Sequence, residues 1–87
     1  MRIKKYPRYT KLEVFWNDIV SDSRWLSTTD IDKMHSAPII SVGFYLCTKK
    51  RELKLAHSIT DDAESDVTVI PWGCITKVKE LETKNEI

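Results

Sequence analysis

The sequence has little cysteine, glycine and proline, with two, two and three residues of these types among 87. Cys47 and Cys74 lack the CxxC spacing and the neighbouring histidine of a zinc site. The longest mostly apolar stretch, Pro38 to Cys47, reaches about half of the roughly 20 residues of a membrane helix. The N-terminus lacks the apolar centre of a secretory signal. These absences predict a cytoplasmic chain with no membrane segment and with two partly buried thiols that are not joined in a disulfide.

An excess of one charge sign is also missing. Fourteen basic residues oppose thirteen acidic residues, for a formal charge of +1. A protein that coats DNA would carry a clear basic excess, so any nucleic-acid site must be local. The hydrophobic share of 41% argues against disorder. A chain of this length supports one domain, 1–87, whose small core favours oligomerisation.

Catalytic and metal-binding motifs are absent as well. The sequence contains no nucleophile elbow, P-loop, HExxH or GxGxxG motif. The acidic stretch from Asp61 to Asp66 lacks the carboxylate offsets and the central glycine of an EF-hand. His57 follows Leu53 and Leu55 at strand spacing, which predicts a core or interface histidine. We therefore expect no enzyme, no metal site and no cofactor.

What is present is strand periodicity. Lys11 to Asn17 alternates, with Leu12, Val14 and Trp16 on one face. Further strands are predicted at 39–47, 52–59, 67–70 and 75–81, and in the 39–47 strand the residues expected to face inward are Ile40, Val42, Phe44 and Leu46. Gly43 indicates a bend or bulge in that strand. The Pro71-Trp72-Gly73 sequence predicts a single 3₁₀ turn before the last strand.

A polar insertion, 18–36, separates the first two strands. Ser27 stands three positions before Asp30 and Thr29 three before Asp32, which is the spacing of a helix N-cap, so one or two helical turns are expected in 28–36. Ile31 and Met34 are three positions apart and are predicted to face the core together. Pro38 ends the helix.

The predicted fold class is therefore mainly β: a small five-stranded SH3-like or Sm-like barrel with one short helix inserted after the first strand. Residues 1–10 form a basic N-terminal segment, and 82–87 form a C-terminal tail. The alternative is a split α+β sandwich with a real helix on one face. The length of the 28–36 helix distinguishes the two.

The closing segment Val67 to Leu81, VTVIPWGCITKVKEL, resembles the last two strands of Sm-like proteins. The larger frame resembles small uncharacterised proteins of phages, with a cyanophage origin as the nearest likeness, through the segments VFWND, SDSRW, SVGFYL and IPWGCI. The resemblance implies a homo-oligomeric ring in which strand four of one subunit joins strand five of the next, in the cytoplasm of an infected bacterial host. Trp72-Gly73 replaces the Arg-Gly pair with which Sm proteins grip RNA, and the helix follows the first strand instead of preceding it.

The candidate ligand-binding residues are three indoles and a cationic hairpin tip: Trp16, Trp25, Trp72, Lys49, Lys50 and Arg51. Exposed indoles stack on bases and cations meet phosphates, whereas buried indoles supply core or subunit contacts and charged tips serve solubility. The N-terminal segment adds Lys4, Lys5 and Arg8 beside Tyr6 and Tyr9, a mixture found in single-strand binders and in disordered tails alike.

Three functional hypotheses follow. The first is a non-enzymatic homo-oligomer that binds RNA or a nucleotide-containing ligand through Trp72 and the basic tip. The second is a protein-interaction or anti-host-defence factor that holds a host protein or a signalling nucleotide, in which Trp25 and the insertion matter most. The third is a minor structural component of a virion.

Overall fold

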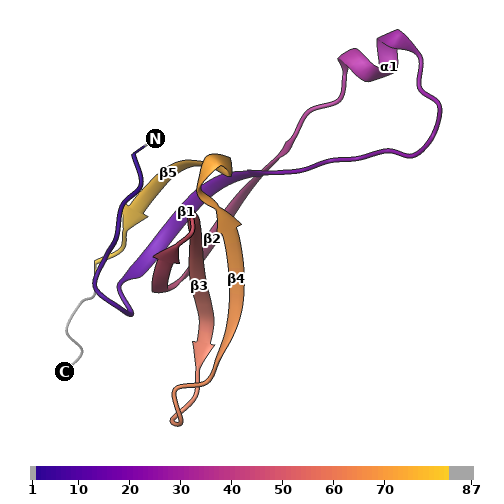
Figure 1. The fold of residues 1–87 in the computed structure, drawn as a ribbon. Coiled ribbons are helices and arrows are strands. Elements are labelled where there is room, and N and C mark those ends of the chain that lie inside the picture. Colours follow the sequence, from indigo (N-terminus) through magenta and orange to yellow (C-terminus); the bar gives the residue numbers. More distant parts are fainter. Residues whose placement is uncertain (1, 83–87) are drawn as a thin grey trace.

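The computed structural model of the chain describes residues 2–82. Five strands form one antiparallel sheet in the order β4-β3-β2-β1-β5 (Figure 1). Along the chain the elements are β1 (Lys11–Asp18), α1 (Thr28–Asp32), β2 (Ala37–Lys49), β3 (Glu52–Ile59), β4 (Ser65–Pro71), the 3₁₀ turn η1 (Trp72–Cys74) and β5 (Ile75–Glu80). The prediction of a mainly β chain with five strands and one short helix is confirmed.

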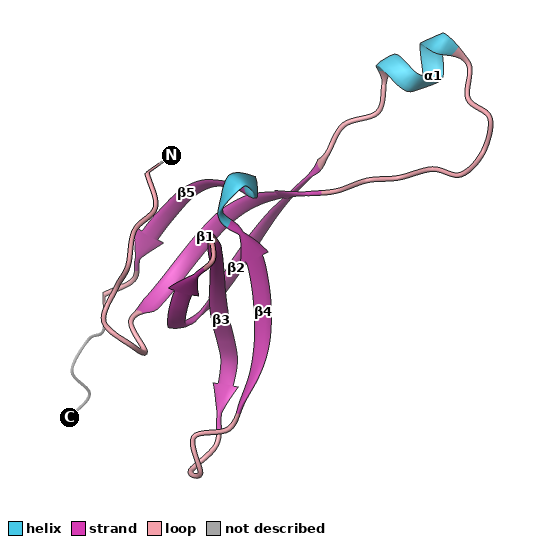
Figure 2. Cartoon of the chain, in the orientation of Figure 1, coloured by secondary structure: helices cyan, strands magenta, loops and turns pink. Residues whose placement is uncertain are grey.

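The helix α1 lies far from the sheet. It has five residues, none of them buried, and occupies the end of a long arm formed by residues 19–36 (Figures 1 and 2). A helix so placed covers neither face of the sheet, so the prediction of an α+β sandwich is wrong. Within residues 2–82 no helix has the length and apolar character needed to cross a membrane.

The N-cap prediction for α1 is confirmed, and its predicted core contact is wrong. The Asp30 backbone N–H donates to Ser27 Oγ at 3.2 Å, which satisfies one of the free amides of the first turn. Ile31 and Met34 are exposed, because the arm carries the helix away from the sheet and its core.

The core lies on one face of the sheet and is small. Its buried apolar residues come from all five strands and from η1: Leu12, Val14, Tyr45, Leu53, Leu55, Ile70, Trp72 and Ile75. Trp16 and Val78 pack against this cluster from β1 and β5. The inward face predicted for β1 is therefore confirmed.

The inward face predicted for β2 is wrong. Gly43 and Tyr45 are buried, whereas Ile40 is 61% and Val42 50% exposed. The pairing with β1 sets this arrangement, because Gly43 lies opposite buried Leu12 and paired residues point to the same side of a sheet. Strand β2 carries apolar residues on both sides, so alternation alone could not identify the core side.

Gly43 permits a close approach between strands. A Cβ atom at this position would lie 2.6 Å from the backbone oxygen of Ala56 in β3. The irregularity in the pairing of β2 with β3 falls between Tyr45 and Cys47, two residues beyond the predicted site. Cys47 and Cys74 are free, half-buried thiols.

The closing segment follows the prediction. Strand β4 leads through the 3₁₀ turn η1 into β5, which pairs with β1. The Trp72 backbone N–H donates to Arg51 O at 2.7 Å, which ties the turn to the β2–β3 hairpin. Of the predicted tail 82–87, residues 83–87 lie outside the described part of the chain.

Candidate functional site

The hairpin between β2 and β3 is a two-residue turn made of cations. Lys49 pairs with Glu52, so Lys50 and Arg51 are the two central residues. Their φ angles are 52° and 62°, the positive values that a type I′ turn requires and that Asn-Gly adopts most easily. Lys49, Lys50 and Arg51 are all exposed.

The N-terminal segment is docked beside this turn. Tyr9 N–H donates to Tyr45 O at 2.7 Å, and Tyr45 N–H donates to Thr10 O at 2.8 Å. Nearer the hairpin, Thr48 Oγ1 donates to Lys4 O at 3.3 Å. These contacts place the start of the chain along the end of β2. We give the name basic surface to the cations of the turn and of the docked segment: Arg2, Lys4, Lys5, Lys49, Lys50 and Arg51.

Aromatic rings anchor the segment. The Tyr6 ring meets the Tyr45 ring edge-on, with centroids 5.4 Å apart. Burial raises the pKa of Tyr6, and the negative charge of Glu80 adds to the effect. Lys4 Nζ lies 5.6 Å from the centre of the Tyr6 ring, and Arg8 Cζ lies 5.3 Å from that of Tyr9. The interleaved cations and tyrosines therefore form local contacts, and Tyr9 stays 40% exposed.

Two of the three predicted indoles are buried or half-buried. Trp72 is 2% exposed and belongs to the core, so the prediction of Trp72 as an exposed stacking residue does not fit this structure. Trp16 is half-buried, and its Nε1–H donates to Ser41 Oγ at 3.0 Å. The basic tip and these indoles are thus not brought together as one ligand surface.

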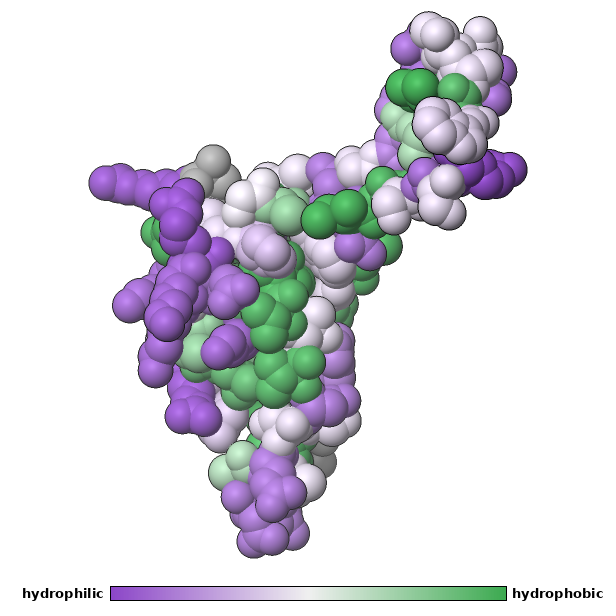
Figure 3. Space-filling model, turned by 45° about the vertical axis from the view of Figure 1, so that its right-hand side comes forward, coloured by the Kyte–Doolittle hydropathy of each residue, from purple (hydrophilic) through white to green (hydrophobic). Residues whose placement is uncertain are grey.

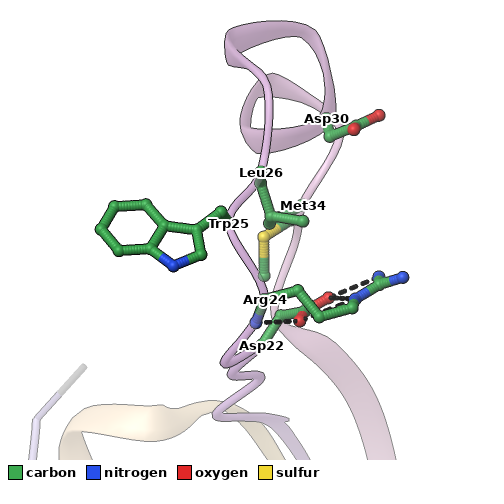
Figure 4. Close-up of a pocket in the computed structure, with 6 residues that line it drawn as sticks. All are labelled: Asp22, Arg24, Trp25, Leu26, Asp30 and Met34. Atoms are coloured by element: carbon green, nitrogen blue, oxygen red, sulfur yellow. Dashed lines mark hydrogen bonds and ion pairs between the residues drawn. The ribbon is translucent and has the colours of Figure 1, made fainter.

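Trp25 is the indole that the structure exposes. It lies on the arm and is exposed to 103% of its reference surface. It contributes to an open hollow with Leu26, Asp30 and Met34, from which the indole projects outward (Figure 4). Beside it, Arg24 forms an ion pair with Asp22 at 2.7 Å, and this hydrogen bond lowers the pKa of the Asp22 carboxyl.

His57 is exposed, so its prediction as a core histidine is wrong, whereas the alternative of an interface histidine stays a prediction. Its Nδ1 lies 3.1 Å from Val42 O and its Nε2 lies 2.8 Å from Thr68 Oγ1. Since a carbonyl oxygen accepts only, Nδ1 carries the hydrogen. The ring links β2, β3 and β4 where the pairing of β3 with β4 becomes irregular between Ala56 and Ile59.

The acidic loop has a structural contact at its end. Asp66 Oδ1 accepts the backbone N–H groups of Ser58 at 2.6 Å and of His57 at 3.0 Å. The first of these bonds is the main cause of a lowered pKa at Asp66. Among residues 2–82, no three His, Cys, Asp or Glu side chains gather where they could hold a metal ion.

A feature that the sequence analysis missed is an apolar face on the side of the sheet opposite the core. Val67 pairs with Ala56, and Ala56 with Phe44, so these side chains form one row. A second row joins Ile40 to Phe15. Ala56 itself is fully buried. We call the surface formed by the others the outer face: Phe15, Ile40, Val42, Phe44, Val67 and Val69. The signal was the apolar composition of both sides of β2.

Hydrophobic side chains are visible on the body of the molecule and on the arm in Figure 3. Comparison of the chain with protein families, with curated proteins and with solved structures found no match. The basic surface, the arm and the outer face are the features of this chain that a ligand or a partner could contact.

Proposed function

We propose that this chain is a non-enzymatic binding protein that holds the phosphate backbone of single-stranded nucleic acid on the basic surface. The observation that carries the proposal is the hairpin turn, where Lys50 and Arg51 occupy left-handed positions beside the docked N-terminal segment. Cations arranged on one side of a molecule attract a polyanion by releasing its counterions.

The backbone conformation of the turn supports a binding role. A non-glycine residue in the left-handed region costs about 1 kcal/mol or more, and Asn-Gly would form the same turn at lower cost. Residues kept in costly conformations cluster at functional sites. Two adjacent cations held this way present their side chains at the end of a rigid hairpin.

The finer fold and assembly are also proposals. The strand order, the pairing of β5 with β1 and the 3₁₀ turn before β5 support an SH3-like or Sm-like barrel. Strands β4 and β5 are the two edges of the sheet, and these are the edges that the predicted ring would join. The ring, the phage origin and a place in a virion stay predictions.

The test is the double variant Lys50→Asn/Arg51→Gly. We expect this variant to resist urea better than the wild type, by about 1 kcal/mol, and to bind a short single-stranded RNA more weakly. Loss of two phosphate contacts lowers the slope of log affinity against log salt by about 1.4. Fluorescence anisotropy of a labelled oligonucleotide measures the affinity and its salt dependence.

The matched control removes the same charge from the arm, in the variant Arg24→Ser/Lys33→Ser. This control should keep the affinity and the salt slope of the wild type. If the hairpin variant binds as tightly as the wild type, or if the control loses as much affinity, the basic surface is not the site.

A second candidate function is contact with a protein through the arm. The observation that favours it is Trp25, a large apolar side chain exposed on all sides, since exposed indoles anchor many protein interfaces. A pull-down with the wild-type chain and with a Trp25 variant tests this candidate. The wild type should retain a partner protein, and the Trp25 variant should not retain it.

A further inference from the structure

We propose that the protein contacted by the arm is a second copy of this chain, and that each arm lies across the outer face of the other copy. The inference rests on the second candidate function and is independent of nucleic-acid binding. It pairs the arm with the outer face, the two apolar regions of the chain that do not belong to the core.

The first step is that the arm and the outer face both leave large apolar side chains exposed. On the arm, Ile19 is 82% exposed and Trp25 fully exposed, with Val20, Ile31 and Met34 also exposed. On the outer face, Ile40, Val42, Val67 and Val69 are exposed by 45% or more. A soluble monomer rarely leaves contiguous apolar patches open, and large patches mark contact sites.

The second step is the position of the arm. It continues the β1–β2 hairpin, since Asp18 still pairs with Ala37 where it begins, and it points away from its own sheet (Figure 1). The described chain measures 57 Å along its longest axis, against 29 and 25 Å along the others. An arm that extends this far reaches a neighbouring molecule without a bend at its base.

The third step is the apolar character of the arm's base. Ile19, Val20 and Met34 line a second hollow together with His35 and Ser36. Ile40 follows in β2, close to the end of the arm in the sequence. Met34 also lines the hollow at Trp25, so apolar side chains lie at the base of the arm and near Trp25, with the polar residues 21–24 between them. Two copies related by a two-fold axis near this base bury these side chains in two equivalent contacts.

The fourth step is charge, which selects a second copy as the occupant. The rows of the outer face carry five lysines, Lys11, Lys49, Lys54, Lys77 and Lys79, against two glutamates, Glu13 and Glu52. The arm has three aspartates, Asp22, Asp30 and Asp32, against Arg24 and Lys33, and Arg24 is paired with Asp22. An acidic arm and a basic face of the same chain complement each other.

The experiment uses two charge-reversed variants and the mass of each in solution. The arm-reversed variant is Asp30→Lys/Asp32→Lys, and the face-reversed variant is Lys77→Glu/Lys79→Glu. We expect the wild type to sediment as a dimer and each variant alone to shift toward monomer. Mixed together, they should form a heterodimer, because one contact then joins reversed arm to reversed face and the other joins the two unchanged surfaces.

Trp25→Ser and Ile3→Ser provide the apolar test and its matched control, as each removes an exposed apolar side chain. Trp25→Ser should be monomeric and should unfold in urea as the wild type does at concentrations too low for dimerisation, whereas Ile3→Ser, outside the arm, should remain dimeric. A wild type that is monomeric at all concentrations overturns the inference. So does an oligomer whose mass survives Trp25→Ser, as a ring through β4 and β5 would, and so do variants that stay monomeric on mixing.

The two proposals about the arm fail separately. If the wild type is monomeric but retains another protein in a manner that depends on Trp25, the second-copy inference is wrong and the second candidate function stands. If the wild type is monomeric and retains no protein, both are wrong.

Discussion

Single residues determine how closely the strands of this sheet approach one another. Gly43 faces the core side of β2, and its missing side chain lets the backbone of Ala56 come close. Gly73 is the other glycine, and a Cβ atom there would meet no heavy atom within 4 Å. Neither glycine has a positive φ angle. The two positions therefore differ in the room available for a side chain and not in the sign of φ.

Substitution of each glycine by alanine tests this difference. Gly43→Ala should destabilise the fold by about 1–3 kcal/mol, because the added methyl group forces β2 and β3 apart. Gly73→Ala should change the free energy of unfolding by less than about 1 kcal/mol. Urea unfolding followed by tryptophan fluorescence measures both, and equal effects would show that the close approach is absent in solution.

Asp66 gives the fold a dependence on acid pH. Its bonds to the Ser58 and His57 amides hold the pKa of the folded carboxyl below the ordinary value, which is about 4 in an unfolded chain. The carboxylate therefore adds stability above about pH 4, and this contribution is lost as the pH falls through the folded pKa. Asp66→Asn should lose less stability than the wild type on acidification.

Unfolding midpoints measured from neutral to acidic pH test this dependence. Asp62→Asn, in the loop before β4, provides the control and should keep the steep acidic decline of the wild type. An Asp66→Asn profile that declines as steeply as the wild type would remove the assigned role.

At the scale of elements, one buried hydroxyl helps to hold the start of the N-terminal segment. Thr48 is 4% exposed, and its Oγ1 lies 2.7 Å from Tyr45 Oη and 3.3 Å from Lys4 O. Thr48→Val should leave the Tyr45 hydroxyl without this partner, at a cost of about 1–3 kcal/mol. The start of the segment around Lys4 should also detach from β2 and become more sensitive to protease.

Thr76→Val is the control for this substitution, since Thr76 Oγ1 donates to Phe15 O from an exposed position. Limited proteolysis with N-terminal sequencing reports the detachment directly. Equal protection of residues 2–10 in wild type and Thr48→Val would contradict the anchoring role.

The strands could be predicted from the sequence because alternation and turn residues are local signals. The 11–18 strand, the cationic hairpin and the 3₁₀ turn after Pro71 all follow such signals. The face of β2 could not be predicted, since Ile40, Val42 and Phe44 are as apolar as the side that is buried. Its orientation depends on pairing with β1, which is a contact between distant residues.

The roles of the three indoles could not be predicted for a similar reason. Trp72 follows a proline in a turn, a position that indicates exposure, yet the fold places it in the core. Trp25 lies in a polar insertion, a position that also indicates exposure, and it is fully exposed. The difference arises from the contacts of each segment with the sheet, and local sequence does not report those contacts.

At the scale of the whole molecule, the chain separates its binding features. The basic surface lies at the β2–β3 hairpin and the N-terminal segment, whereas the arm begins where β1 ends and β2 starts. The small core leaves the outer face and the arm uncovered. A second copy that covers both would also add to the limited stability of a chain of this length.

The most direct test of this account is the environment of Trp25 as protein concentration rises. Fluorine NMR of the fluorotryptophan-labelled chain, with Trp25 assigned through Trp25→Phe, follows all three indoles at once. We expect the Trp25 resonance to move with concentration while those of Trp16 and Trp72 stay fixed. A Trp25 resonance that keeps the position of a solvent-exposed indole at every concentration would contradict the account.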